Sequence, residues 1–201
     1  MDTPKVHEDP VKLDQAIEHI CYEIQRLQEC FELSEAQAPH CTEDVIELTL
    51  YHARAVLDFL EKSRSDEPKP HRTDILSEDY KFPAKKLPIP KLPNSDLETR
   101  VRINREVAHL SYCRCGRTVE QKMWYFGAFV PIILKHSLHC LQHIHKNEMG
   151  LDSKPDSKTK IEDRIKALRK YDGPAALIES ETGIIGWTGS SQMSVSPRPP
   201  T

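Results

Sequence analysis

Three residues with useful chemistry share one face of a helix predicted between residues 95 and 115. Arg102, Arg105 and His109 are spaced so that their side chains fall within an arc of about 60° on a helix. An arginine guanidinium holds phosphate through fork-shaped hydrogen bonds, and a histidine can move a proton near neutral pH. This face therefore suits a phosphodiester, with the arginines binding the phosphate and the histidine acting as general acid or base.

The segment from Arg102 to His109 resembles the signature of the HEPN superfamily, the helical domains found in many prokaryotic ribonuclease toxins and defence proteins. That signature is an arginine, often followed closely by a polar residue such as asparagine, and then a histidine after four to six intervening residues. Here six residues separate Arg102 from His109, and Asn104 stands close by. The segment Tyr51–Leu60 looks like the preceding helix in bacterial proteins of this type, so the resemblance covers roughly residues 10–148.

The resemblance implies a metal-independent endoribonuclease without a cofactor, acting as a toxin or phage-defence effector. His109 would be the acid or base, Arg102 would bind the scissile phosphate, and Arg105 and Asn104 would assist. The ribose 2′-hydroxyl of the RNA would be the nucleophile. Arg102 and His109 stand about 10 Å apart along one helix, so a symmetric dimer would bring Arg102 of one chain towards His109 of the other. The expected partners are RNA, a second copy of the chain, and an antitoxin or other protein.

The superfamily also contains members that bind without cutting, which leaves a second hypothesis open. In that hypothesis the chain is a non-catalytic helical module for a protein partner or a nucleotide, and the stripe is a recognition or salt-bridge surface. Side-chain placement separates the two hypotheses. Catalysis requires Arg102 and His109 to face a cleft or a two-fold interface, whereas a buried His109 bonded to local carbonyls favours the module.

Arg54 and Asp58 stand four residues apart on the helix predicted before residue 65, and two interpretations apply. In the first they form an ordinary intrahelical salt bridge. In the second Asp58 orients Arg54 towards the helix that carries Arg102, where Arg54 contacts the substrate.

A histidine-rich run near the end of the last long helix offers ligands for zinc, copper or nickel. Helix positions i and i+7 are about 10 Å apart, so one ion can bridge only an adjacent pair and needs further ligands from elsewhere. The weak metal candidates are His136, His139, Cys140 and His143. The alternatives are a metal-binding sensor and a histidine-rich surface near the end of a helix, where imidazolium is mildly favoured.

Composition bounds the class of protein. The 201 residues carry a formal net charge of -3, so an RNA site must be a local basic patch. A basic run offers one such patch or simply a solvated helix, because acidic residues interrupt it; its members are Lys154, Lys158, Lys160, Arg164, Lys166, Arg169 and Lys170. The longest apolar run, residues 124–134, is too short to span a bilayer, and the polar N-terminus is no signal peptide. These features predict a cytoplasmic protein with no membrane contact.

Apolar periodicity predicts an all-α fold, an antiparallel bundle of four or five helices. The helices are expected over 10–33, 43–64, 95–115, 118–150 and 159–171, with kinks at Gly127 and Pro131. A Pro-rich loop, 65–94, separates the second and third helices, and its apolar middle part is expected to dock on the core. The predicted divisions are an N-terminal tail (1–9), the HEPN-like bundle (10–150), a basic C-terminal helix (151–172) and a flexible tail (173–201), in which 175–178 and 183–187 are weak strand candidates.

Overall fold

The structure, a computed structural model, is an all-α helical bundle. It describes residues 10–37, 42–66, 68–71, 73–92, 95–108, 123–147, 155–173, 177–179 and 185–187. The α-helices of this part are α1 (Pro10–Gln37), α2 (Glu43–Glu61), α3 (Thr99–Ala108), α6 (Val130–Lys146) and α7 (Pro155–Leu168). Short 3-10 helices are η2 (Ser77–Tyr80), η3 (Phe126–Ala128) and η4 (Arg169–Tyr171).

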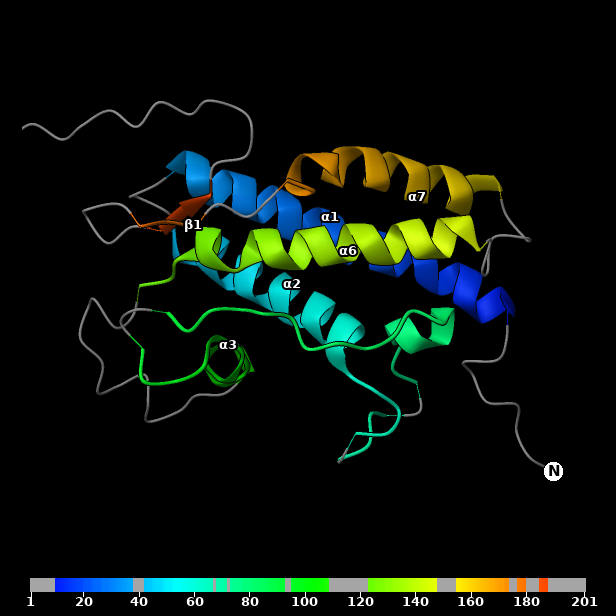
Figure 1. Cartoon of the computed structure of the whole chain (residues 1–201), viewed down its shortest axis with the longest axis horizontal. Helices are drawn as coiled ribbons and strands as arrows, with labels where there is room; N and C mark the ends of the chain where they lie inside the picture. The colour runs from blue at the N-terminus through cyan, green and yellow to red at the C-terminus, as the bar shows by residue number, and fades with distance from the viewer. Residues whose placement is uncertain are drawn as a thin grey trace, which may run out of the picture.

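The helix pairs α1–α2, α1–α6 and α6–α7 run antiparallel, as the sequence predicted, whereas the contacting pairs α1–α7 and α2–α6 run parallel. Figure 1 shows α6 running opposite to both α1 and α7, and α2 running opposite to α1. The helix α3 is short and lies at the edge of the bundle against α2. The bundle thus leaves two sides of α2 in contact with different helices, α1 on one side and α3 on the other.

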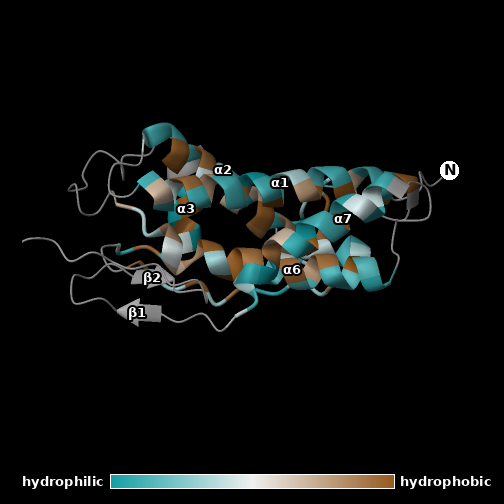
Figure 2. Ribbon diagram, turned by 90° about the horizontal axis from the view of Figure 1, so that it is seen from above, coloured by the Kyte–Doolittle hydropathy of each residue, from teal (hydrophilic) through white to brown (hydrophobic). Residues whose placement is uncertain are grey.

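The core forms where the apolar stripes of α1, α2 and α6 meet. Figure 2 shows hydrophobic residues gathered on the inner sides of the helices and hydrophilic residues outside. The predicted α1 stripe is confirmed, because Ile17, Ile24 and Leu27 are almost fully buried. On α2 the prediction is wrong for Leu48, which is 42% exposed. Burial of such side chains is the main driving force for the fold.

Pro131 explains the main difference between the predicted and observed helices. A single kinked helix from residue 118 was expected, but η3 covers residues 126–128 and α6 begins only at Val130. A proline lacks the N–H needed inside a helix but is tolerated in its first turn, and Pro131 occupies that turn. The proline therefore starts a helix here instead of bending one.

The third helix also begins later than its sequence signal. A capping box at residues 95–98 predicted the start, but α3 begins at Thr99. Ser95 uses its hydroxyl locally, since its Oγ accepts the N–H of Leu97 at 3.1 Å and donates to the carbonyl of Leu97 at 3.0 Å. These bonds close a turn before the helix.

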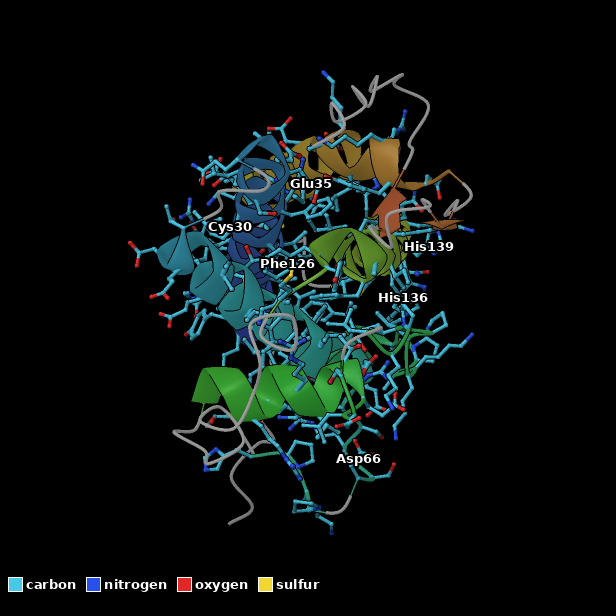
Figure 3. The ribbon with its side chains drawn as sticks, turned by 90° about the vertical axis from the view of Figure 1, so that its left-hand side faces the viewer. Cys30, Glu35, Asp66, Phe126, His136 and His139 are labelled. Atoms are coloured by element: carbon cyan, nitrogen blue, oxygen red, sulfur yellow. The ribbon has the colours of Figure 1, made fainter. Side chains whose placement is uncertain are left out.

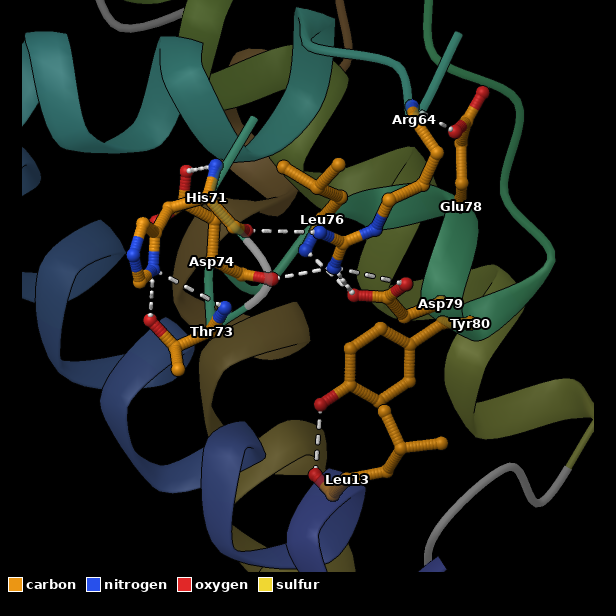
Figure 4. A network of polar contacts seen from close by, with 9 residues as sticks. All are labelled: Leu13, Arg64, His71, Thr73, Asp74, Leu76, Glu78, Asp79 and Tyr80. Atoms are coloured by element: carbon orange, nitrogen blue, oxygen red, sulfur yellow. Dashed lines mark hydrogen bonds and ion pairs between the residues drawn. The ribbon is translucent and has the colours of Figure 1, made fainter. Parts of the chain in front are cut away.

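The Pro-rich loop is held on the bundle by a polar network (Figure 4). The guanidinium of Arg64 donates to Asp79 at 2.9 Å and to the backbone carbonyls of His71 and Asp74. The hydroxyl of Tyr80 donates to the carbonyl of Leu13 on α1 at 2.7 Å. Leu76 and Tyr80 are buried, so docking of the loop is confirmed, although Ile75 is 36% exposed.

A short two-stranded ladder lies within the segment predicted as a tail. β1 (Leu177–Glu179) pairs antiparallel with β2 (Ile185–Trp187), with Ile178 opposite Gly186. The two strands fall on the two weak strand candidates. The tail prediction did not anticipate that they pair.

Candidate functional site

Arg102 lies inside the protein. Its side chain is fully buried, and its Nη1 donates to the carbonyl of Met123 at 2.9 Å. The guanidinium carbon sits 4.0 Å from the centre of the Trp124 ring, which is cation–π geometry. Burial lowers the pKa of Arg102 to about 10. Arg102 thus joins α3 to the segment before α6.

The other stripe residues separate from Arg102. Asn104 and Arg105 are exposed on α3. His109, the proposed acid or base, lies outside the described residues, and α3 is described as far as Ala108. The structure therefore puts Arg105 at the surface and Arg102 in the core, although both belong to the predicted stripe.

A hollow of about 200 Å³ lies between α2, α3 and the Pro-rich loop. It brings together three residues that the sequence singled out, namely Arg54, Asp58 and Asn104. The remaining lining residues were not predicted; they are Leu57, Glu61, Lys62, Asp66, Lys86, Arg100 and Ile103. Lys86 and Arg100 were missed because only the folded loop and α3 bring them to α2.

Two ion pairs neutralise much of the charge around this α2–α3 hollow. Lys62 donates to Asp58 at 2.9 Å, so Asp58 pairs along α2 with Lys62 and not with Arg54 as predicted. Arg100 makes a bidentate pair with Glu61, through Nε at 2.6 Å and Nη2 at 2.5 Å. The Glu61 carboxylate also accepts the N–H of Leu87 at 2.7 Å, which fixes the loop to the end of α2.

Two cations remain after these pairs are formed. Among the described residues, neither Arg54 nor Lys86 takes part in an ion pair. Arg54 is half-buried on α2 and Lys86 is exposed on the loop. The third carboxylate at the hollow, Asp66, accepts the N–H of Ser63 at 2.8 Å. The hollow thus presents a fork-shaped donor, a point charge and the Asn104 amide beside the carboxylate of Asp66.

The histidine-rich run of α6 does not form a metal centre in the described part of the chain, where no group of three or more His, Cys, Asp or Glu is placed to hold an ion. Cys140 is fully buried and burial raises its pKa. His136 and His143 both make edge-type contacts with the Phe82 ring, whose centre is 5.4 Å from the His136 ring centre and 5.5 Å from that of His143. His139 is exposed and 3.3 Å from Asp172.

Much of the basic run faces α1. Lys160 pairs with Glu18 and Lys170 pairs with Glu32, each at 2.5 Å. Arg164 donates to Gln25 at 2.7 Å. These three residues attach α7 and η4 to α1, whereas Lys158, Lys166 and Arg169 are exposed.

Comparisons with protein-family models, curated protein sequences and solved structures find no match to this chain. None of the described helices is long and apolar enough to cross a membrane.

Proposed function

We propose that this chain is a helical module that binds a phosphate-bearing ligand, a free nucleotide or an RNA, at the α2–α3 hollow. The observation that supports it is the pair of cations, Arg54 and Lys86, that line the hollow without a carboxylate partner among the described residues. Asn104 adds an amide donor from α3. These are the groups that proteins use to hold phosphate oxygens.

The size of the hollow limits what it holds. At about 200 Å³ it is smaller than a typical small-molecule pocket of about 300–1,000 Å³. A phosphate with part of its sugar is the proposed occupant, and the rest of the ligand lies outside. The neutralised pairs Asp58–Lys62 and Glu61–Arg100 build the walls without adding net charge.

A second candidate is the metal-independent endoribonuclease that the HEPN resemblance implies, acting in the cytoplasm as a toxin or defence effector. The exposure of Arg105, one helical turn before His109 in the sequence, favours it. Because Arg102 is buried, the phosphate contacts in this candidate come from Arg105 and Arg54. His109 remains the acid or base, and a homodimer and an antitoxin remain the proposed partners.

The binding proposal is tested by calorimetric titration with ribose 5-phosphate and with a short single-stranded RNA. Arg54→Gln should weaken both ligands about tenfold or more, because charge-assisted hydrogen bonds are lost. Lys86→Gln should weaken them less, and Lys91→Gln, an exposed lysine of the same loop outside the hollow, should have no effect. Equal binding by wild type and Arg54→Gln would refute the proposal.

Cleavage is tested separately, with total RNA in EDTA. Cleavage that His109→Ala abolishes while RNA binding persists would establish the ribonuclease. If the wild-type protein bound RNA without cleaving it, the non-catalytic binding module would be the supported function.

A further inference from the structure

A second hollow lies on the neighbouring face of α2, between α1 and α2. It measures about 270 Å³ and includes one end of the Pro-rich loop. Its apolar lining comes from both helices and the loop: Ile20, Ile24, Ala55, Val56, Phe59, Ile75 and Leu76. This α1–α2 groove is therefore suited to a flat apolar ring more than to a phosphate.

Carboxylates stand at the edge of the α1–α2 groove. Glu23 of α1 and Asp74 of the loop line it, together with exposed His19. His52 donates through Nδ1 to one oxygen of Glu23 at 2.7 Å, and the N–H of His71 donates to one oxygen of Asp74 at 2.9 Å. Each of these bonds uses one oxygen of its carboxylate.

The two hollows meet at one ion pair. Asp58 and Lys62 line both, one helical turn apart on α2. Figure 3 shows α2 lying between α1 and α3, and the Asp58–Lys62 pair borders both hollows. The α2–α3 hollow carries the cations Arg54 and Lys86, and the α1–α2 groove carries the carboxylates Glu23 and Asp74.

This distribution of charge and polarity matches the two ends of a nucleotide. A phosphate is anionic, whereas a base is a flat ring whose edge carries N–H donors. We infer that the α1–α2 groove binds the base of the ligand whose phosphate occupies the α2–α3 hollow, and that this base is guanine. The inference rests on the proposed function for the phosphate and extends it to the identity of the base.

The carboxylates select guanine because of its donor pattern. A carboxylate has two acceptor oxygens and no donor when ionised. Guanine presents a ring N–H and an adjacent amino group on one edge, so it donates one bond to each oxygen of a carboxylate, and the oxygen that already accepts a histidine N–H uses its second lone pair. Adenine presents an amino group beside a ring acceptor, which a carboxylate would repel. A well-made bidentate pair discriminates between bases by about 1–3 kcal/mol, or roughly 5- to 150-fold.

The test is calorimetric titration of the full chain with GMP, AMP, guanosine, adenosine and ribose 5-phosphate. GMP should bind about tenfold or more tightly than AMP, and guanosine should exceed adenosine by a similar factor. Glu23→Gln and Asp74→Asn should reduce this preference and leave binding of ribose 5-phosphate unchanged. Glu47→Gln, an exposed α2 residue that lines neither hollow, is the matched control. Thermal melting checks that each variant is folded.

The outcomes distinguish the two claims. Guanosine and adenosine binding alike, or a preference that survives both carboxylate variants, would overturn the base site whatever happens with phosphate. Failure of ribose 5-phosphate and GMP to respond to Arg54→Gln would overturn the phosphate site. A guanosine preference that persists in Arg54→Gln and disappears in Glu23→Gln would support the base site on its own.

Discussion

Arg102 shows how a residue that looks functional in the sequence can be structural in the fold. Its guanidinium bonds to the carbonyl of Met123 and covers the Trp124 ring inside the core. A desolvated cation–π contact contributes about 2 kcal/mol or more. Burying the charged guanidinium is unfavourable, as the lowered pKa of Arg102 shows, and these contacts offset the cost of removing the charge from water.

We expect Arg102→Ala to lower the free energy of unfolding by about 3 kcal/mol, because it leaves a cavity and an unpaired carbonyl. Chemical denaturation measures this loss. Arg105→Ala, one turn along the same helix but exposed, should change stability by less than about 0.5 kcal/mol. If the Arg102→Ala protein kept its stability but lost RNA binding, Arg102 would be a phosphate-binding residue and not a structural one.

At this scale the sequence predicted which residue types matter but not the direction of each side chain. Arg102 and Arg105 are about 60° apart on the helix, and the boundary between core and solvent runs between them. Helical spacing cannot locate that boundary, since it depends on how the Met123–Trp124 segment packs against α3. Arg54, Asp58 and Asn104 line one hollow, as their selection from the sequence suggested. The sequence did not predict that Asp58 pairs with Lys62 instead of Arg54, because both cations are one helical turn from Asp58.

His136 gives the protein a pH-dependent contribution to stability. Burial, and then the nearby charges of His139 and Lys85, lower its pKa, while Glu61 acts in the opposite sense. The unfolded chain therefore takes up the proton more readily, and stability falls as pH drops through the ordinary histidine range near 6.5. Denaturation at pH 7.5 and 5.5 should show a smaller pH effect in His136→Asn than in wild type. An unchanged difference would show that other groups cause it.

Among the elements, the Pro-rich loop owes its order to Arg64 more than to its own backbone. Prolines remove donors from residues 83–93, so the loop cannot form a regular ladder of hydrogen bonds. Arg64 holds the first part of the loop through bonds to Asp79 and to two carbonyls (Figure 4), and Glu61 and Arg100 hold the later part at Leu87. The docked loop in turn supplies Lys86 to one hollow and Asp74 to the other.

Arg64→Leu should therefore destabilise the protein by about 2 kcal/mol, because the carboxylate of Asp79, only 4% exposed, loses its cation. Limited proteolysis should also cut faster between residues 62 and 76. Lys69→Leu, in the same loop but exposed, is the control and should do neither. Equal cleavage of the two variants would mean that Leu76 and Tyr80 hold the loop without Arg64.

Helix positions followed from apolar spacing, but helix ends did not. The predicted start of α1 at Pro10, a residue type suited to the first helical position, is confirmed, but the helix extends to Gln37, four residues beyond the expected Leu33. The start of α6 was misplaced because a proline is compatible with both a kink and a first turn. Only the packing of Phe126 and Phe129 in the core decides between them here.

For the whole molecule, the net charge of -3 means that long-range attraction cannot bring RNA to the surface unaided. Lys160 and Arg164 of α7 and Lys170 of η4 are engaged with α1, whereas Lys158, Lys166 and Arg169 are exposed. We propose that phosphates are contacted by Arg54 and Lys86 of the α2–α3 hollow and by the exposed Arg105 of α3.

The salt dependence of RNA binding tests whether the RNA contacts the α2–α3 hollow or α7. Three phosphate contacts to a single strand predict that log K falls against log salt with a slope of about −2. Arg54→Gln should make the slope shallower by about 0.7, whereas Lys166→Gln, an exposed α7 residue, should leave it unchanged. Fluorescence anisotropy with a short RNA at several salt concentrations measures both. A steeper slope that relaxes in Lys166→Gln would mean that α7 binds the RNA and that the α2–α3 hollow does not.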